Sequence, residues 1–278
     1  MNEALVRVPY RGGTVEIEHA WLNRERTAAP LLVFLHEGLG SVSAWRDFPE
    51  RLCNACGFRG LVYSRPGYGR STPRPQQERW PPSFMHEQAR DLLPALLTSL
   101  EVDSAADPPW LLGHSDGGSI ALIYAASFPQ QVAAVVAFAP HIFVEDVSIA
   151  SIAAARQVYM TADLRQKLAR HHADPDSAFW GWNDVWLDPE FRGWNIESLL
   201  PSIQCPVLAL QGRDDAYGTL AQIEGIARAV PHTMLLALDN CGHSPHRDQP
   251  ELVTRAVTEF VVRLSRPMRT NAWTRSHS

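Results

Sequence analysis

The 278-residue sequence has little of what marks a membrane-spanning, secreted or nucleic-acid-binding protein. Its apolar runs are all shorter than the roughly 18–20 residues that cross a bilayer. The first residues, Met1 to Arg7, lack the charged-then-apolar layout of a signal peptide. The net charge is −5, and no block of basic residues favours a polyanion. We therefore expect a cytoplasmic protein that acts on a small molecule, with neither nucleic acid nor a membrane as a partner.

Cysteine is also scarce, with four residues in the whole chain. That number is too small for a disulfide framework in a chain of this length. Cys53 and Cys56 form a C-x-x-C pattern, but no second pair and no histidine cluster accompanies them. We interpret both as packing residues on a helix, and we expect no metal site and no cofactor.

Short apolar runs alternate with helix-forming stretches along most of the chain. Continuously apolar strands are typical of a sheet covered by helices on both faces, and the alternation predicts a mostly parallel sheet and an α/β fold. The first two strands alternate apolar and polar residues, as an antiparallel hairpin does. The expected strands are Val6–Tyr10, Thr14–Trp21, Leu31–Leu35, Gly60–Ser64, Trp110–Leu112, Ala133–Ala139, Pro206–Leu210 and Met234–Leu238. The expected helices are Ala44–Cys56, one that begins after an N-cap at Ser83, Ile120–Ala126, Ile149–Ala169, Leu220–Ala229 and Pro250–Leu264.

One long segment interrupts this pattern. Residues 141–204 carry no strong strand signal and are rich in helix formers and tryptophan. We therefore predict that residues 1–140 and 205–266 form one α/β core and that residues 141–204 form an inserted helical cap. The polar residues 267–278 are expected to be a flexible tail.

The segment Gly113-His114-Ser115-Asp116-Gly117 lies between an apolar strand and a helix-forming run. The G-x-S-x-G pattern in this context predicts a nucleophile elbow, a sharp turn that exposes the serine at the start of a helix. The glycines matter because side chains two positions from the serine would clash in so tight a turn. The elbow needs an acid and a histidine later in the chain.

Both partners follow later strands, where the reactive groups of α/β sheets gather. Asp214 and Asp215 follow the strand that ends at Leu210, and His243 and His246 follow the strand that ends at Leu238. The order serine, aspartate, histidine is the one that this architecture requires. We predict Ser115 as nucleophile, His243 as base and Asp215 as the acid that orients it, with Asp214 and His246 as rivals.

The chain resembles the α/β-hydrolase family of serine esterases over about residues 14–264. The elbow, the turn Gly212-Arg213-Asp214-Asp215, the pair Gly242-His243 and the segment Arg65-Pro66-Gly67-Tyr68-Gly69-Arg70-Ser71 all match family patterns. The Ser-Asp-Gly-Gly elbow and the helical cap are most similar to the valacyclovir-hydrolase-like (biphenyl hydrolase-like) branch. Family spacing favours Asp215 over Asp214 as the acid. His246 lacks the preceding glycine of the family's G-H pair, so we expect it to be a rim or loop residue.

The resemblance also implies an oxyanion hole built from two backbone N–H groups. One comes from Asp116, and the other from the loop after Leu35, which usually reads H-G-x. Here that loop reads His36-Glu37-Gly38-Leu39-Gly40. The second donor is therefore Gly38 or Leu39, with Gly38 favoured.

Four residues are candidates for substrate binding. In the branch named above, the position of Asp116 is associated with a substrate ammonium group; the alternative is that Asp116 hydrogen-bonds its own helix N-terminus. Glu37 either contacts substrate or anchors its loop. Trp182 and Trp186 either line an apolar pocket or pack the cap, as most aromatic residues there are expected to do.

The predicted function is cofactor-free hydrolysis of a small carboxylic ester through an acyl-enzyme. The same triad serves amide, lactone and carbon–carbon bond hydrolases, and receptor-like binding proteins on this fold retain it.

A serine nucleophile argues against haloalkane dehalogenases and epoxide hydrolases. The Gly67-x-Gly69 loop lacks the third glycine of a dinucleotide site. The sequence leaves the oligomeric state open.

Overall fold

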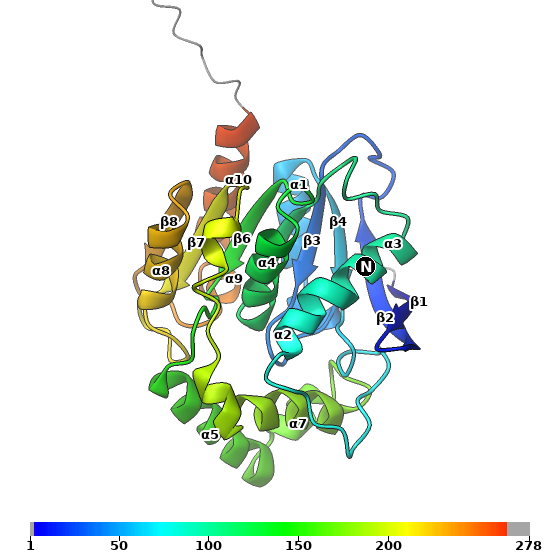
Figure 1. The fold of residues 1–278 in the computed structure, drawn as a ribbon, viewed down its shortest axis with the longest axis vertical. Helices are drawn as coiled ribbons and strands as arrows, with labels where there is room; N and C mark the ends of the chain where they lie inside the picture. The colour runs from blue at the N-terminus through cyan, green and yellow to red at the C-terminus, as the bar shows by residue number, and fades with distance from the viewer. Residues whose placement is uncertain (1–2, 266–278) are drawn as a thin grey trace, which may run out of the picture.

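An eight-stranded sheet with the order β1-β2-β4-β3-β5-β6-β7-β8 forms the centre of the protein (Figure 1). The computed structural model describes residues 3–265, so the tail predicted for residues 267–278 lies outside the described residues. The strands are β1 (Glu3–Tyr10), β2 (Gly13–Leu22), β3 (Leu31–Leu35), β4 (Arg59–Tyr63), β5 (Trp110–His114), β6 (Ala134–Phe138), β7 (Val207–Gly212) and β8 (Thr233–Leu238). β1 and β2 form the predicted antiparallel hairpin, and β2 pairs antiparallel with β4. All the other pairs are parallel, which confirms the predicted α/β fold.

The strand register brings the ends of the central strands to one edge of the sheet. Leu35 of β3 lies opposite Gly113 of β5, and His114 lies opposite Phe138 of β6. Gly212 of β7 lies opposite Leu238 of β8. The residues that follow these strands therefore lie near one another, as α/β sheets require.

Helices cover both faces of this sheet. The helices within residues 3–265 are α1 (Phe48–Cys56), α2 (Phe84–Glu87), α3 (Leu93–Ser99), α4 (Asp116–Ser127), α5 (Asp146–Thr161), α6 (Leu164–Leu168), α7 (Pro175–Trp186), α8 (Ala221–Ala229), α9 (Pro245–Asp248) and α10 (Pro250–Ser265). A π-helical turn, η2 (Gln88–Leu92), joins α2 to α3, and three 3₁₀ turns are η1 (Ser43–Trp45), η3 (Pro189–Gly193) and η4 (Leu200–Ser202).

Successive residues of the strands enter two different hydrophobic cores. Val33 and Leu35 belong to the core beneath α3, α4 and α8, whereas Leu32 and Phe34 belong to the core beneath α1 and α10. This division follows from the two-residue period of a strand, whose side chains point alternately to opposite faces. It explains why the central strands are continuously apolar.

Two predicted helices are each divided in the structure. The segment Ala44–Cys56 forms η1 and then α1, because Pro49 lies in the first turn of α1 and a helix that ran back through it would clash with the preceding turn. The segment Ile149–Ala169 forms α5 and α6, separated by the extended backbone of Ala162 (φ −133°, ψ −155°). Ser83 precedes its helix as predicted, but its hydroxyl donates to the Glu87 side chain and accepts no capping hydrogen bond from a backbone N–H.

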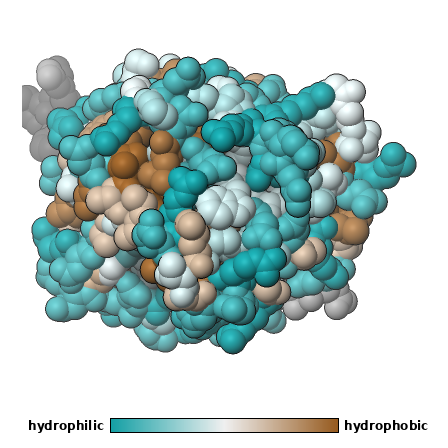
Figure 2. Space-filling model, turned by 90° about the horizontal axis from the view of Figure 1, so that it is seen from below, coloured by the Kyte–Doolittle hydropathy of each residue, from teal (hydrophilic) through white to brown (hydrophobic). Residues whose placement is uncertain are grey.

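The helices between β6 and β7 lie beyond one end of the sheet, at the bottom of Figure 1. Figure 2 views the molecule from that side and shows mostly hydrophilic residues, interrupted by separate hydrophobic groups. The exposed large apolar residues of this segment are Val147, Val158 and Met160 on α5. We call residues 141–204 the α5–α7 segment.

Cys53 and Cys56 both lie on α1, as the sequence predicts. All four cysteines are free thiols, and Cys53 is buried on α1. No helix within residues 3–265 is both long enough and apolar enough to cross a membrane.

Candidate active site

Ser115 lies at the turn between β5 and α4 and has a strained backbone, with φ 52° and ψ −121°. A non-glycine residue adopts such a conformation only when its surroundings enforce it. Here a Cβ atom at Gly113 would overlap the backbone of Gly117, and one at Gly117 would overlap the Leu35 carbonyl of β3. Glycine at both positions therefore allows the turn to close over the sheet.

The Ser115, His243 and Asp215 side chains form one continuous hydrogen-bonded chain. The Ser115 Oγ lies 2.9 Å from His243 Nε2, and His243 Nδ1 lies 2.9 Å from each Asp215 carboxylate oxygen. The carboxylate also accepts hydrogen bonds from the Tyr217 backbone N–H at 2.8 Å and the Gln211 side chain at 3.0 Å. These donors fix the acid so that it faces the imidazole.

The environment of Asp215 keeps it ionised. Burial alone would raise the pKa of this carboxyl, whose side chain is 1% exposed. The hydrogen bond and charge of His243 outweigh burial, with help from the Tyr217 N–H, and the pKa is lowered. An ionised acid can hold His243 in the tautomer that accepts a proton from serine.

Asp214 and His246, the alternative acid and base, are not part of this hydrogen-bonded chain. Asp214 is exposed, and its backbone N–H donates to the Cys241 carbonyl. The expectation that His246 is a rim or loop residue is wrong. It lies on α9, is 3% exposed and packs among Trp45, Phe48 and Phe138.

The predicted oxyanion donors lie around Ser115. Asp116 is the first residue of α4, where a backbone N–H has no acceptor within the helix. Gly38 and Leu39 line the same cavity as Ser115, and neither backbone N–H donates a hydrogen bond within residues 3–265. A side chain at position 38 would overlap the Trp182 indole, so the loop can lie this close to α7 only with glycine there.

A cavity of about 190 Å³ opens above Ser115 and His243. Trp182 and Trp186 of α7 line it, together with Ile152 of α5 and Tyr217. Both tryptophans are almost fully buried, at 6% and 1% exposure. By contrast, Trp180 packs against Tyr159, and Trp194 stacks on Phe191.

Asp116 is fully buried beside this cavity and makes internal contacts. Its Oδ1 accepts a hydrogen bond from Trp186 Nε1 at 3.1 Å, and its Oδ2 lies 3.8 Å from the buried Arg65 guanidinium. Burial raises the pKa of this carboxyl, while Arg65 and Trp186 act in the opposite direction. The expected hydrogen bond to its own helix N-terminus is wrong, because the side chain is turned toward Trp186 and Arg65.

Glu37 lies in the cavity wall and is held by two basic side chains. Its carboxylate oxygens lie 3.3 Å from Arg247 and 3.5 Å from His114 Nδ1. Burial would raise the pKa of Glu37, but His114 and Arg247 outweigh it and lower that pKa well below its ordinary value. The loop carbonyl of Glu37 also accepts a hydrogen bond from Arg65 at 2.9 Å.

Sequence reasoning missed three residues around the site. His141 lines the cavity and follows β6, so the strand-end rule could have identified it. Arg65 follows β4 in the same way. His172 had no sequence signal. It accepts a hydrogen bond from the Gly69 backbone N–H and donates to the Leu39 carbonyl, and it thereby joins the α5–α7 segment to the loop that follows β3.

Buried histidines whose pKa is lowered make the fold sensitive to acid. Burial lowers the pKa of His36, His141, His172 and His246, to about 3 for His141. In the unfolded chain the same groups take up protons near pH 6.5, so the unfolded state binds more protons and stability falls as the pH drops below 6.5. A histidine that stays neutral in the folded state down to pH 5 removes up to about 1.4 kcal/mol of unfolding free energy per pH unit below 6.5. Urea unfolding at pH 7.0, 6.0 and 5.0, above the range where most carboxylates titrate, measures this slope.

The variant His246→Phe provides a matched control. Neither ring nitrogen of His246 has a hydrogen-bond partner within residues 3–265, and aromatic rings surround it. The variant should fold, and its slope should be smaller by up to about 1.4 kcal/mol per pH unit because the contribution of one buried histidine is gone. An unfolding free energy that does not change between pH 7.0 and 5.0 would contradict the explanation.

The sequence matches a known protein family over most of its length. Residues 32–256 match the model described as the Alpha/beta hydrolase family. The human protein named Serine hydrolase BPHL is 26% identical over 201 residues, which are 68% of this chain and 64% of that protein. The match thus spans a little less than two thirds of the human protein's length. The Pimeloyl-[acyl-carrier protein] methyl ester esterase of Vibrio campbellii is 25% identical over 262 residues, covering 83% of this chain and 94% of that enzyme.

A solved structure has the same fold. A thermophilic esterase from Thermogutta terrifontis superposes with a TM-score of 0.72 at 20% sequence identity. The superposition covers 95% of this chain and 99% of the esterase chain. At this identity the likeness concerns the arrangement of helices and strands.

Proposed function

This chain belongs to the alpha/beta hydrolase family, and on that premise we propose that it is a serine hydrolase that cleaves small carboxylic esters. The observation that carries the proposal is the Ser115–His243–Asp215 chain, with 2.9 Å between successive partners, at the base of a cavity. Nucleophile, base and orienting acid are then within the distances that such catalysis needs.

The reaction proceeds in two halves. His243 Nε2 takes the proton from Ser115 as its Oγ attacks the ester carbonyl carbon, and the imidazolium then protonates the leaving alcohol. Water, deprotonated by His243, releases the acid from the acyl-enzyme in the second half. Asp215 stabilises the imidazolium of His243 in both halves of the reaction. The Asp116 N–H and the N–H of Gly38 or Leu39 stabilise the oxyanion.

The charges around the cavity support a neutral substrate. Glu37 is balanced by Arg247, and Asp116 by Arg65, so neither carboxylate needs a substrate cation. The rest of the wall is largely apolar, with Ile152, Trp182 and Trp186. The cavity has a volume of about 190 Å³, which is below the range for drug-sized ligands. This small volume supports a substrate with a short acyl chain.

A panel of p-nitrophenyl esters tests this function. We expect a burst of p-nitrophenol equal to the enzyme concentration and then slower turnover, because the acyl-enzyme accumulates. Acetyl and butyryl esters should react faster than octanoyl and dodecanoyl esters. Absence of turnover with the whole panel would contradict ester hydrolysis and would favour a receptor-like role.

The contacts of Asp116 lead to a separate prediction about Asp116→Asn. Asparagine can still accept the Trp186 hydrogen bond, but Arg65 loses its buried counter-charge. The unfolding free energy should fall by roughly 3 kcal/mol for that reason. The p-nitrophenyl esters of L-valine and of isovaleric acid should lose activity by the same factor, because Asp116 positions Trp186 and binds no ammonium group.

The two esters differ only in the ammonium group, so the ratio of the activities with them measures how well the enzyme recognises that group. A selective loss of the valine ester in Asp116→Asn would show that Asp116 binds substrate. Thermal unfolding of the variant, measured in parallel, separates a loss of folded enzyme from a change in preference.

We also propose that the α5–α7 segment acts as a cap over the core. Support comes from the cavity lining, because Ile152, Trp182 and Trp186 all belong to this segment. His172 supports the same role through its bonds to Gly69 and Leu39. The cytoplasmic location stays a prediction from the sequence.

A further inference from the structure

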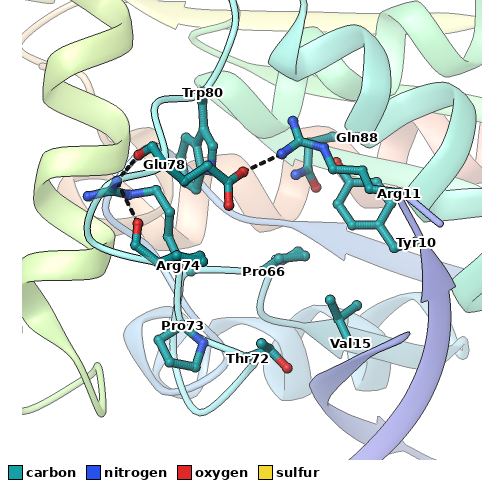
Figure 3. A pocket seen from close by; sticks show the side chains of 12 residues that line it. Tyr10, Arg11, Val15, Pro66, Thr72, Pro73, Arg74, Glu78, Trp80 and Gln88 are labelled. Carbon is teal, nitrogen blue, oxygen red and sulfur yellow. Dashed lines mark hydrogen bonds and ion pairs between the residues drawn. The ribbon is translucent and has the colours of Figure 1, made fainter. Parts of the chain in front are cut away.

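A second cavity, of about 230 Å³, lies between the β1–β2 hairpin and the loop that follows β4 (Figure 3). Tyr10 and Val15 of the hairpin, Pro66 and Trp80 of the loop, and Gln88 of η2 line it. None of its lining residues within the described chain also lines the cavity above Ser115. We call it the hairpin cavity.

Gln88 presents an unused carboxamide to this cavity. The residue is 5% exposed, its Oε1 is buried without a partner, and its side chain makes no hydrogen bond within residues 3–265. A buried amide without a partner is costly, so such groups are normally satisfied. Gln88 also begins the π-helical turn η2, and single π-helical turns are frequent at functional sites. Figure 3 shows the carboxamide beneath its helix, on the same side of the cavity as Trp80.

Trp80 supplies a rigid flat surface next to this carboxamide. Its ring lies parallel to Phe84, with centroids 5.8 Å apart and an interplanar angle of 16°. Gly67, at φ 91°, and Gly181 of α7 lie so close that a Cβ at either position would come within 3.0 Å of the indole. The backbone therefore holds the ring in one orientation, which lowers the entropic cost of stacking a ligand on it.

The charged residues in and beside the hairpin cavity balance one another in number. Arg11 pairs with both Glu78 and Glu87. Arg74 donates to the backbone carbonyls of Pro75, Gln76 and Glu78, as Figure 3 shows in part. Arg74 has no carboxylate partner within residues 3–265, but the two cations Arg11 and Arg74 and the two carboxylates Glu78 and Glu87 together carry no net charge. The cavity thus favours an uncharged ligand.

We propose that the hairpin cavity is a second binding site, for a neutral aromatic carboxamide. The ring stacks on Trp80, and the amide edge exchanges two hydrogen bonds with the Gln88 carboxamide, which offers one donor and one acceptor. An apolar cavity of 150 Å³ holds benzene, so about 230 Å³ admits one ring with a carboxamide substituent.

Calorimetric titration with benzamide tests the site. Benzamide should bind the wild type, and Gln88→Leu should weaken it about tenfold or more because two hydrogen bonds are lost. Gln77→Leu changes an exposed glutamine in the same loop and should leave the affinity unchanged. Toluene, which has the ring without the amide, should bind Gln88→Leu as well as it binds the wild type.

Two further variants locate the ligand. Trp80→Leu should weaken benzamide binding, and Trp186→Leu, at the catalytic cavity, should leave it unchanged. If Gln88→Leu does not fold, as judged by circular dichroism, Gln88→Met makes the same comparison. Equal affinity of wild type and the Gln88 variant, no binding to the wild type, or loss of binding in Trp186→Leu alone would each overturn the proposal.

Discussion

Replacing Ser115 by alanine is expected to lower kcat for p-nitrophenyl butyrate by roughly 10⁵- to 10⁶-fold, as loss of a triad nucleophile does. The variant keeps the cavity and the oxyanion donors, so KM should change little and a small residual rate above that in water should remain. The strained backbone at position 115 accommodates alanine as it accommodates serine, because both carry one Cβ. Steady-state kinetics with highly purified protein measures the effect.

Ser244→Ala is the matched control for this variant. Ser244 lines the same cavity and carries the same hydroxyl group, but His243 makes no hydrogen bond to it in the described part of the chain. Its removal should change kcat by no more than a few fold. A comparable loss in both variants would mean that the cavity, and not the nucleophile, was damaged.

The second large effect concerns Asp215→Asn, which should lower kcat by about 10⁴-fold. The asparagine oxygen can still accept the Tyr217 N–H, which turns the NH₂ group toward His243 Nδ1. That nitrogen must then accept a hydrogen bond, so the proton moves to Nε2 and the imidazole can no longer act as a base toward Ser115. The fold should survive, because the new side chain has the same shape.

Asp214→Asn separates the two neighbouring acids. Asp214 is exposed and makes no side-chain contact with His243 in the described chain, so its variant should retain activity within about twofold. If Asp214→Asn lost more activity than Asp215→Asn, the assignment of the acid would be wrong. Rates between pH 6 and 9 for both variants complete the comparison.

The fold was largely predictable because its signals are local. Five-residue apolar runs such as Leu31–Leu35 fall on strands, and Pro250–Leu264 falls on α10 almost residue for residue. The errors arise where a local feature interrupts a favourable pattern. Pro49 in the first turn of α1 delays the start of that helix to Phe48, and the extended Ala162 separates α5 from α6, although the residues around both positions favour a helix.

The candidate site was predictable to the extent that it follows strand ends. Ser115, Asp215 and His243 each follow a parallel strand, so the topology brings them to one edge of the sheet. Contacts between distant segments carry no such signal. The bond from Trp186 to Asp116 joins residues 70 positions apart, and the place of His246 depends on rings from three other elements.

Labelling with a fluorophosphonate tests the central claim most directly, because the reagent phosphonylates only a serine that a neighbouring base has activated. Mass spectrometry of the treated wild type should show one adduct, located on the peptide that contains Ser115, and Ser115→Ala should show none. An unlabelled wild type, or equal labelling of Ser115→Ala, would contradict a serine hydrolase that acts through Ser115.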